Sequence, residues 1–179
     1  MARITLSKGI DTMFNLADYF EKNPPKGKPI IIDFYGPIYK KDAEYFWEEI
    51  NKHLNVKYMG IFEPSKIYTI ASQYDLLIFP TRYQGEGFPG TIMDAYISGI
   101  PVIASNWKSI PEFIDINKTG FVFNLGQENE LNSLVINLYN NPELLKQMKQ
   151  NAYQKSKEYS AEKAWEILKP YLGSTLKSL

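Results

Sequence analysis

Residues 86 to 105 read Glu-Gly-Phe-Pro-Gly-Thr-Ile-Met-Asp-Ala-Tyr-Ile-Ser-Gly-Ile-Pro-Val-Ile-Ala-Ser, the pattern of a loop, a helix and a strand. The apolar stripe of a helix that lies on a core follows the spacing i, i+3, i+4 and i+7, here occupied by Ile92, Ala95, Tyr96 and Gly99. Gly99 suits the left-handed position after a helix end, and Pro101 cannot continue the helix. Residues 102 to 104 then predict a buried strand, so the stretch indicates an α/β fold.

The loop at residues 86 to 90 leads into the N-terminus of this predicted helix. Free backbone N–H groups and the positive end of the helix macrodipole favour an anion such as phosphate there. We expect Gly87 and Gly90 to let the backbone approach a ligand closely and to adopt positive φ. Two carboxylates, Glu86 and Asp94, lie eight positions apart around this helix start. The pattern therefore favours a site for a phosphorylated ligand.

A purely structural explanation of the same residues stays open. Thr91 and Asp94 nearly fit the spacing of a helix cap, in which Asp94 would only accept a hydrogen bond from the first turn. Glu86 would then be an exposed loop acid. Short motifs of this kind also occur by chance, so the residues alone do not decide between the two explanations.

The whole string resembles the Glu-x7-Glu signature of glycosyltransferase family 4, retaining enzymes of the GT-B fold. Pro89 replaces a glycine of that signature, and Asp94 replaces its second glutamate with a side chain one methylene shorter. The resemblance implies that Glu86 is catalytic beside the donor sugar and that Asp94 binds the ribose hydroxyls. It also implies that the donor is held by the backbone of the intervening residues, Gly87, Phe88, Gly90 and Thr91.

A second element near the N-terminus, Arg3-Ile-Thr-Leu-Ser-Lys8-Gly, resembles the Arg-x4-Lys-Gly element of the same family. There the arginine and lysine bind the donor diphosphate, so the resemblance implies that Arg3 and Lys8 stabilise the leaving group. An isolated arginine and lysine would more commonly be solvated surface residues. The family has a complete strand before this element, but here only Met1 and Ala2 precede Arg3. We expect a truncated first strand, or a stub of it over residues 2 to 5.

Elsewhere along the chain, helix-like and strand-like segments alternate. The helices are expected at 10–22, 42–53, 65–73, 128–139, 142–158 and 161–172, and the strands at 30–34, 56–59, 76–79 and 120–123. This order predicts a doubly wound, Rossmann-like parallel sheet that binds ligands beyond the carboxyl ends of its strands. Gly36 and Gly60 follow such strands, and in the resembling family the loop with Met59 and Gly60 holds the nucleobase. Ser109 and Glu112 are spaced to cap a further short helix.

Composition limits the possible functions. The 179 residues are 44% apolar, which suits one domain, and the 20 basic and 20 acidic side chains cancel. Zero net charge gives no general reason to expect nucleic-acid binding, and the lack of cysteine excludes thiolate chemistry. His53, the single histidine, is expected at the surface near a helix end. No run is long and apolar enough to span a membrane, so the expected location is the cytoplasm.

Together these features predict the single C-terminal, donor-binding half of a GT-B glycosyltransferase. Residues 1–179 would form one nucleotide-sugar-binding domain with the helices of 142–172 at its edge, and the N-terminal acceptor domain would be absent. The donor implied is a UDP- or GDP-sugar, with no metal and no other cofactor. The missing half, on the same gene product or a separate chain, could add peripheral association with the inner face of the membrane.

The role of such a half stays open at this stage. The resemblance implies polysaccharide or glycan synthesis at the cell surface and no transfer by this chain alone. Two alternatives to this leading hypothesis stay open: one subunit of a split enzyme, or a module that binds nucleotide-sugars without catalysis. The last helix carries an apolar stripe that could pack on its own domain or stay exposed in the isolated chain, and the stripe consists of Ala161, Ala164, Trp165, Leu168, Tyr171 and Leu172.

Overall fold

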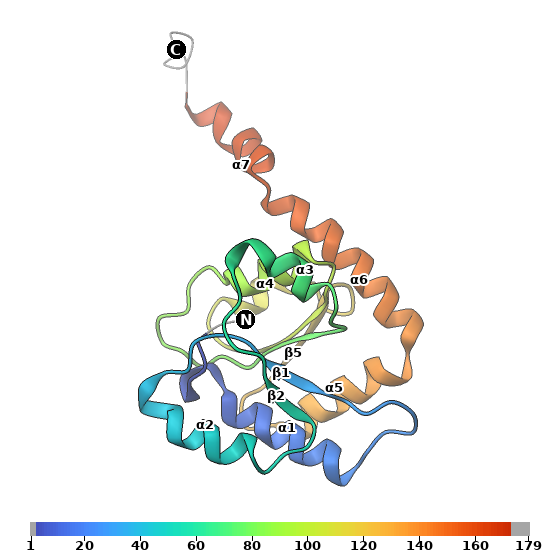
Figure 1. Ribbon diagram of the computed structural model, residues 1–179. Coiled ribbons are helices and arrows are strands. Elements are labelled where there is room, and N and C mark those ends of the chain that lie inside the picture. Colours follow the sequence, from blue (N-terminus) through green and yellow to red (C-terminus); the bar gives the residue numbers. More distant parts are fainter. Residues whose placement is uncertain (1–2, 173–179) are drawn as a thin grey trace.

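The computed structural model describes residues 3 to 172, in which strands and helices alternate along the chain (Figure 1). The strands are β1 (Ile32–Phe34), β2 (Val56–Tyr58), β3 (Leu77–Phe79), β4 (Val102–Ser105) and β5 (Gly120–Phe123). The α-helices are α1 (Ile10–Lys22), α2 (Ala43–Ile50), α3 (Ile67–Ala71), α4 (Gly90–Ile97), α5 (Glu128–Asn140), α6 (Pro142–Ser156) and α7 (Ala161–Leu168). Short 3-10 helices are η1 (Leu6–Lys8), η2 (Lys40–Asp42), η3 (Pro64–Lys66), η4 (Ile110–Phe113), η5 (Lys157–Tyr159) and η6 (Lys169–Tyr171).

All strand pairs in the described part of the chain are parallel, as the sequence predicts. They form two sheets, β1-β2 and β3-β4-β5, rather than one continuous sheet. The stub predicted over residues 2 to 5 is reduced to one parallel bridge between Ile4 and Ile38, and Ala2 lies outside the described residues. The strands therefore form two separate sheets, because between residues 3 and 172 no strand pairs with both β1 and β3.

Helices cover both faces of the strands, which makes the fold doubly wound. One apolar cluster packs α1, α2 and α5 against the strands through residues such as Phe14, Phe46 and Leu131. The other packs α3, α4 and α6 on the opposite face through residues such as Tyr96 and Ala152. Figure 1 shows these two helical layers on either side of the strands. Strands buried on both faces are typical of parallel sheets, and the two cores therefore fix the position of the strand ends.

Helix α4 forms as its sequence pattern predicts. Ile92, Ala95 and Tyr96 are buried, and Gly99 has a φ of 69°, the left-handed conformation expected after the helix end. The Tyr96 hydroxyl anchors the helix by donating to the Phe113 carbonyl at 2.9 Å. These contacts hold the first turn of α4 at the carboxyl end of β3.

Two local predictions are wrong. His53 is not a surface side chain: its ring is only 8% exposed and stacks on Phe14 at 5.8 Å, because the turn after α2 folds back onto α1. Ser109 precedes η4, but its side chain makes no capping hydrogen bond, so the capping box with Glu112 does not form.

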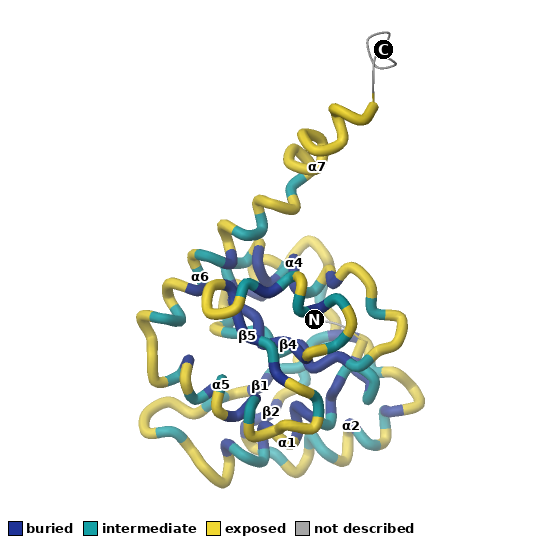
Figure 2. Tube along the Cα trace, turned by 180° about the vertical axis from the view of Figure 1, so that it is seen from behind, coloured by how far each residue is buried: buried dark blue, intermediate teal, exposed yellow. Residues whose placement is uncertain are grey.

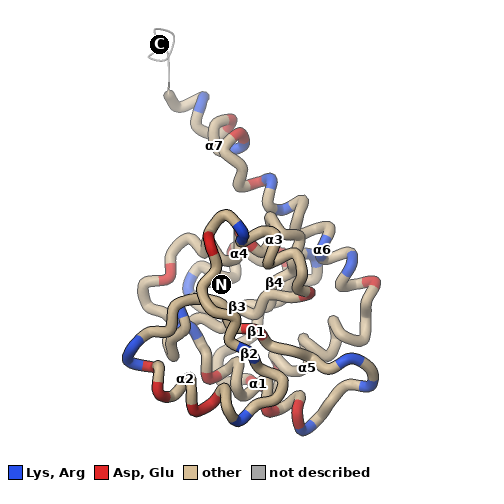
Figure 3. Tube along the Cα trace, in the orientation of Figure 1, with Lys and Arg blue, Asp and Glu red and all other residues tan. Residues whose placement is uncertain are grey.

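The last helix, α7, projects away from the rest of the molecule (Figure 2). Every residue from 161 to 172 is exposed, including Trp165 and Leu168. The possibility that this stripe packs on its own domain is therefore wrong, and the exposed alternative is confirmed. Basic and acidic positions are interspersed along α7, so its polar face carries both signs of charge (Figure 3).

Candidate functional site

The turn from Thr5 to Gly9 carries the predicted lysine and is held by a buried carboxylate. Asp42 accepts hydrogen bonds from the Thr5 hydroxyl at 2.5 Å and from the Leu6 N–H at 3.0 Å. Gly9 ends η1 with a φ of 78°, and a Cβ at this position would lie 2.1 Å from the Pro80 carbonyl oxygen. Only glycine fits this close approach to the end of β3, so the turn places Lys8 beside the loop that follows β3.

Lys8 and Glu86 form an ion pair at the carboxyl end of β3. The Lys8 Nζ lies 2.6 Å from the Glu86 Oε2, and the two side chains are 20% and 10% exposed. The Thr81 hydroxyl donates to the same Glu86 oxygen at 2.5 Å, while the Lys8 ammonium lies 4.9 Å from the centre of the Tyr83 ring. Glu86 is therefore no exposed loop acid. The structure brings together two residues that are 78 positions apart in the sequence.

The loop that carries Glu86 is fixed from three sides. The buried Ser105 hydroxyl donates to the Thr81 carbonyl at 2.5 Å, and the Trp107 indole N–H donates to the Tyr83 carbonyl at 2.9 Å. The Arg82 N–H donates to the Ser7 carbonyl at 2.9 Å, which joins this loop to the Lys8 turn. The Arg82 guanidinium forms an ion pair with the Asp11 carboxylate, with 2.8 Å between the nitrogen and the oxygen. The sequence analysis missed Asp42, Thr81 and Ser105 as supports. For Thr81 and Ser105, a hydroxyl residue at the carboxyl end of a buried strand was the available signal.

The start of α4 follows this loop, and its glycines do not act as predicted. Neither Gly87 nor Gly90 is among the residues with positive φ, and a Cβ on either would meet no atom within 4 Å. The prediction of positive φ is wrong, because the chain enters the helix through the buried Pro89 without a left-handed turn. The glycines instead leave open space in front of the first helical turn. Phe88 is 64% exposed, and its ring contacts the edge of Phe113 at 5.5 Å.

Asp94 lies one turn further along α4. The N-cap of the helix is Pro89, so Thr91 sits inside the first turn and the capping explanation for Thr91 and Asp94 does not hold. The Asp94 side chain is half-buried, and burial raises the pKa of its carboxyl above the usual value. It lines a groove of about 730 Å³ together with Arg3, Lys8 and Thr91. The groove therefore joins Arg3 and Lys8 of one sequence element with Thr91 and Asp94 of the other, whereas Glu86, Gly87, Phe88 and Gly90 are not part of its lining.

Arg3 lies near this end of the groove but is exposed. Its guanidinium lies 5.8 Å from the centre of the Tyr39 ring, a distance at which a cation is attracted by the aromatic face. It reaches the groove from the β1 side, whereas Lys8 reaches it from the β3 side. The two cations are thus placed on opposite sides of the same opening.

Gly36 and Gly60 meet at the carboxyl ends of β1 and β2. Both have positive φ, 132° and 82°, and the Gly36 N–H donates to the Gly60 carbonyl at 2.9 Å. The neighbouring Met59 is 47% exposed, but its N–H is already bound to the Phe34 carbonyl. The Met59 N–H and the Gly60 carbonyl are thus already used within this loop.

Among residues 3 to 172, no group of three or more His, Asp or Glu side chains is arranged to hold a metal ion. In the same described range, no helix is long and apolar enough to cross a membrane. Arg3, Lys8 and Asp94 line the groove near the carboxyl end of β3, and Glu86 is paired with Lys8 beside it.

Comparison with known proteins assigns the chain to a family. Residues 1–155 match the model of a family described as glycosyl transferases group 1. The chain belongs to this group 1 glycosyltransferase family. Its cation–carboxylate cluster thus lies in an α/β domain of a glycosyltransferase.

The group 1 domain also has curated relatives. It is 32% identical over 145 residues to a chitobiosyldiphosphodolichol beta-mannosyltransferase of Candida glabrata, covering 75% of this chain and 30% of that protein. It is 30% identical over 115 residues to an uncharacterized 41.2 kDa protein in the cps region of Klebsiella pneumoniae, covering 62% and 31%. The chain thus spans about a third of the length of these two relatives.

Solved structures share the fold. Anabaena Alr3699/HepE in complex with UDP has a TM-score of 0.78 at 19% identity, with 100% of this chain and 48% of that chain covered. The pneumococcal O-GlcNAc transferase GtfA, in complex with UDP and GlcNAc, has a TM-score of 0.78 at 23% identity, with 97% and 34% covered. The described domain thus corresponds to one Rossmann-like half of a GT-B glycosyltransferase.

Proposed function

We propose that this group 1 domain binds the donor of a retaining, family 4 type glycosyltransferase, a UDP- or GDP-activated sugar. The observation that carries the proposal is the Lys8–Glu86 ion pair, held by Thr81 in the loop that leads into the N-terminus of α4. A diphosphate at this helix start would meet a cation, free backbone N–H groups and the positive helix pole together. UDP in the solved HepE and GtfA structures supports the choice of a nucleotide ligand.

Each residue then has a separate role in the proposal. Lys8 and Arg3 would neutralise the diphosphate, and they would stabilise the negative charge that builds up on the leaving group. The backbone of Gly87, Phe88, Gly90 and Thr91 would hold the phosphates at the helix start, where the glycines leave open space. No metal or other cofactor is needed in this scheme, because the cations and the helix pole supply the positive charge.

The carboxylates would bind the two sugar rings of the donor. Glu86 would orient the transferred sugar, since Lys8 and Thr81 fix its position. Asp94 would accept hydrogen bonds from the ribose hydroxyls, although it is shorter than the glutamate of the resembling family. The base would lie against the loop of Met59 and Gly60, near Gly36.

The reaction needs a second half that holds the acceptor. Positioning two reactants can supply about 7 to 11 kcal/mol of a barrier, and the chain spans about a third of its curated relatives. We therefore propose that this chain binds donor but does not transfer sugar alone, and that an acceptor domain on the same product or on a separate chain completes the enzyme. The product would be a cell-surface or extracellular glycan, made in the cytoplasm or at the inner face of the membrane.

Calorimetry with UDP-, GDP- and ADP-sugars, on wild type and Asp94→Ala, tests the proposal. We expect a UDP- or GDP-sugar to bind wild type, and we expect at least tenfold weaker binding in Asp94→Ala. Equal affinity in both proteins would remove Asp94 from the ribose site. If no nucleotide-sugar binds wild type, the donor assignment is wrong. Turnover onto a defined acceptor by the chain alone would contradict the need for a second half.

A further inference from the structure

The loop that carries Glu86 is held by the turn that follows β4. In this turn the Trp107 indole N–H donates to the Tyr83 carbonyl at 2.9 Å, and the Lys108 ammonium donates to the next carbonyl, that of Gln84. Two adjacent side chains of one segment thus bind two adjacent carbonyls of another. We call this pair of residues, Trp107 and Lys108, the clasp.

The backbone of the clasp has a conformation that a lysine rarely adopts. Lys108 has a φ of 49°, in the left-handed region that favours glycine. Such a conformation costs free energy and persists where the surrounding structure fixes it. The turn is fixed at its start, because the Asn106 N–H donates to the Phe123 carbonyl of β5 at 2.7 Å. The clasp is therefore supported by the sheet on one side and bonded to the Glu86 loop on the other.

The residue that the clasp fixes is Tyr83. The Glu86 N–H donates to the same Tyr83 carbonyl at 3.1 Å, and the Tyr83 N–H donates to the Thr81 hydroxyl at 3.3 Å. The Tyr83 ring folds back over Gly85, where a Cβ would lie 2.8 Å from a ring carbon. A glycine at position 85 therefore leaves the space that this ring occupies.

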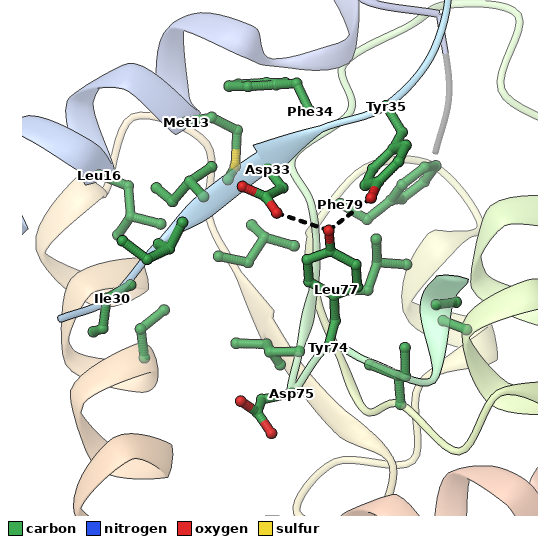
Figure 4. A pocket seen from close by; sticks show the side chains of 18 of the residues that line it. Met13, Leu16, Ile30, Asp33, Phe34, Tyr35, Tyr74, Asp75, Leu77 and Phe79 are labelled. Carbon is green, nitrogen blue, oxygen red and sulfur yellow. Dashed lines mark hydrogen bonds between the residues drawn. The ribbon is translucent and has the colours of Figure 1, made fainter. Parts of the chain in front are cut away.

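The Tyr83 ring lies over the Lys8 ammonium, with 4.9 Å between the ring centre and Nζ. The Phe79 ring, which lines the groove in Figure 4, lies 5.7 Å from the same nitrogen. Within about 6 Å, the face of an aromatic ring attracts a cation. Lys8 is therefore held among the Glu86 carboxylate and two rings. Phe79 belongs to β3, so Tyr83 is the ring whose position depends on the clasp.

We propose that Tyr83 is a positioning residue for Lys8, and that Trp107 and Lys108 act on the donor site by holding Tyr83 over the lysine ammonium. The inference rests on the proposed function, in which Lys8 binds the donor diphosphate. The ring keeps the ammonium beside Glu86, so less side-chain freedom is lost when a diphosphate binds. Tyr83 acts through Lys8, and its hydroxyl is not needed for this role.

The ligand-free protein tests the positioning. The ring current of Tyr83 should place the NMR signals of the Lys8 ε-methylene protons upfield of those of exposed lysines. Tyr83→Leu should move these signals toward the exposed lysines, whereas Tyr83→Phe keeps the ring and should preserve them. Trp107→Phe/Lys108→Met removes both clasp donors and should move them as Tyr83→Leu does. The matched control is Trp165→Phe in the exposed helix α7, which should leave them unchanged.

Donor affinity, measured by calorimetry with the UDP- or GDP-sugar, tests the consequence for binding. Tyr83→Leu should bind about fivefold more weakly, as expected for the loss of a cation–π contact at a partly exposed site. Tyr83→Phe should restore the affinity. Lys8→Met/Tyr83→Leu should bind no more weakly than Lys8→Met alone, because a positioning residue has no effect once the residue that it positions is gone.

Each measurement can overturn the proposal. Unchanged Lys8 signals in Tyr83→Leu, or in the variant without clasp donors, would show that the lysine is held without them. If that double variant does not fold, Trp107→Phe alone takes its place. Weaker donor binding by Tyr83→Phe, or an additive loss in Lys8→Met/Tyr83→Leu, would show that Tyr83 contacts the donor itself. If no nucleotide-sugar binds wild type, the proposed function fails, while the Lys8 signals still decide whether Tyr83 positions the lysine.

Discussion

At the scale of single residues, neighbouring side chains hold the Lys8–Glu86 ion pair in place, and both members of the pair are mostly shielded from solvent. Asp42 fixes the backbone on one side of the pair and Thr81 fixes the carboxylate on the other. Both side chains are mostly shielded from water, so a charge left without its partner is poorly solvated. The same shielding strengthens any interaction of Lys8 with a bound anion.

The first prediction concerns this pair. Lys8→Met should lower the free energy of unfolding by about 1–3 kcal/mol, because Glu86 loses its cation and keeps only the Thr81 hydroxyl. The double variant Lys8→Met/Glu86→Gln should recover part of the loss, since it leaves no buried charge unpaired. Urea unfolding measures both. Strictly additive losses from Lys8→Met and Glu86→Gln would show that the pair is not coupled.

Asp94 gives a prediction with a defined pH dependence. Burial raises the pKa of its carboxyl in the folded chain, so the folded state binds this proton more tightly than the unfolded state does. Asp94 therefore destabilises the ligand-free protein above its folded pKa, and this cost disappears as the pH falls below the unfolded value of about 3.9. Asp94→Asn should raise the melting temperature at pH 7, and the gain should shrink as the pH falls through the folded pKa toward the unfolded value.

The same substitution should weaken donor binding, because an amide accepts fewer ribose hydroxyls than a carboxylate. Thermal unfolding with and without nucleotide-sugar separates the two effects. A lower melting temperature of ligand-free Asp94→Asn at pH 7 would contradict the stability prediction. A gain that grows toward acid pH would contradict the sign of the pKa shift.

At the scale of elements, the Lys8 turn depends on one glycine. Gly9 has a φ of 78°, and its Cα faces the Pro80 carbonyl so closely that a Cβ would lie 2.1 Å from the oxygen. Gly9→Ala should therefore lower the free energy of unfolding by at least about 2 kcal/mol, through backbone strain and the clash with the end of β3. Denaturant unfolding monitored by circular dichroism provides the value.

The matched control for Gly9→Ala is a glycine in the loop of residues 86 to 90. Gly87→Ala adds the same methyl group where no atom lies within 4 Å and φ is not positive, so stability should change by less than about 0.5 kcal/mol. Equal losses in Gly9→Ala and Gly87→Ala would mean that the close approach to β3 does not limit residue 9.

Most elements could be predicted from the sequence because their signals are local. The bounds of α1 agree with the prediction, because its apolar residues recur regularly at helical spacing. The bounds of β5 also agree, because a glycine begins its apolar run and a polar residue follows it. The division into two sheets could not be predicted, because it depends on which segment lies between β1 and β3. His53 was misplaced because the path of the turn after α2, which brings its ring onto Phe14, leaves no mark in the sequence.

The candidate site was predicted in part. Both sequence elements, residues 3 to 9 and residues 86 to 105, were located. The structure places Lys8 of the first against Glu86 of the second, as expected if both lie at the carboxyl ends of the strands. The conformations of Gly87 and Gly90 were predicted wrongly, because φ depends on how the loop is held and not on which residues permit positive values. Asp42 was missed because its partners Thr5 and Leu6 are more than 30 positions away.

At the scale of the whole molecule, α7 adds no contact area to the core. All residues from 161 to 172 are exposed, whereas Met148 in α6 is fully buried. Deletion of residues 161–179 should therefore leave the unfolding midpoint unchanged. Met148→Ala should cost about 2–5 kcal/mol, because it removes a buried side chain from the core. A deletion that destabilises as much as Met148→Ala would show that α7 packs on this domain.

Helix α7 also differs from the rest of the described chain in its relation to the family match. The group 1 family assignment covers residues 1–155, which leaves α7 outside the matched region. The residues that we propose for donor binding, from Lys8 to Asp94, lie within that region. The proposed donor binding is therefore what this chain can be tested for by itself.

An amide-resolved NMR titration of the chain with a UDP-sugar and a GDP-sugar tests the central claim most directly. We predict that one of them shifts the amide signals of Lys8, of Gly87 to Thr91 and of Asp94 with a single saturation curve. Lys8→Met, folded as judged by its spectrum, should bind at least tenfold more weakly. Shifts confined to other parts of the molecule, or undiminished affinity in Lys8→Met, would contradict a donor site at this rim.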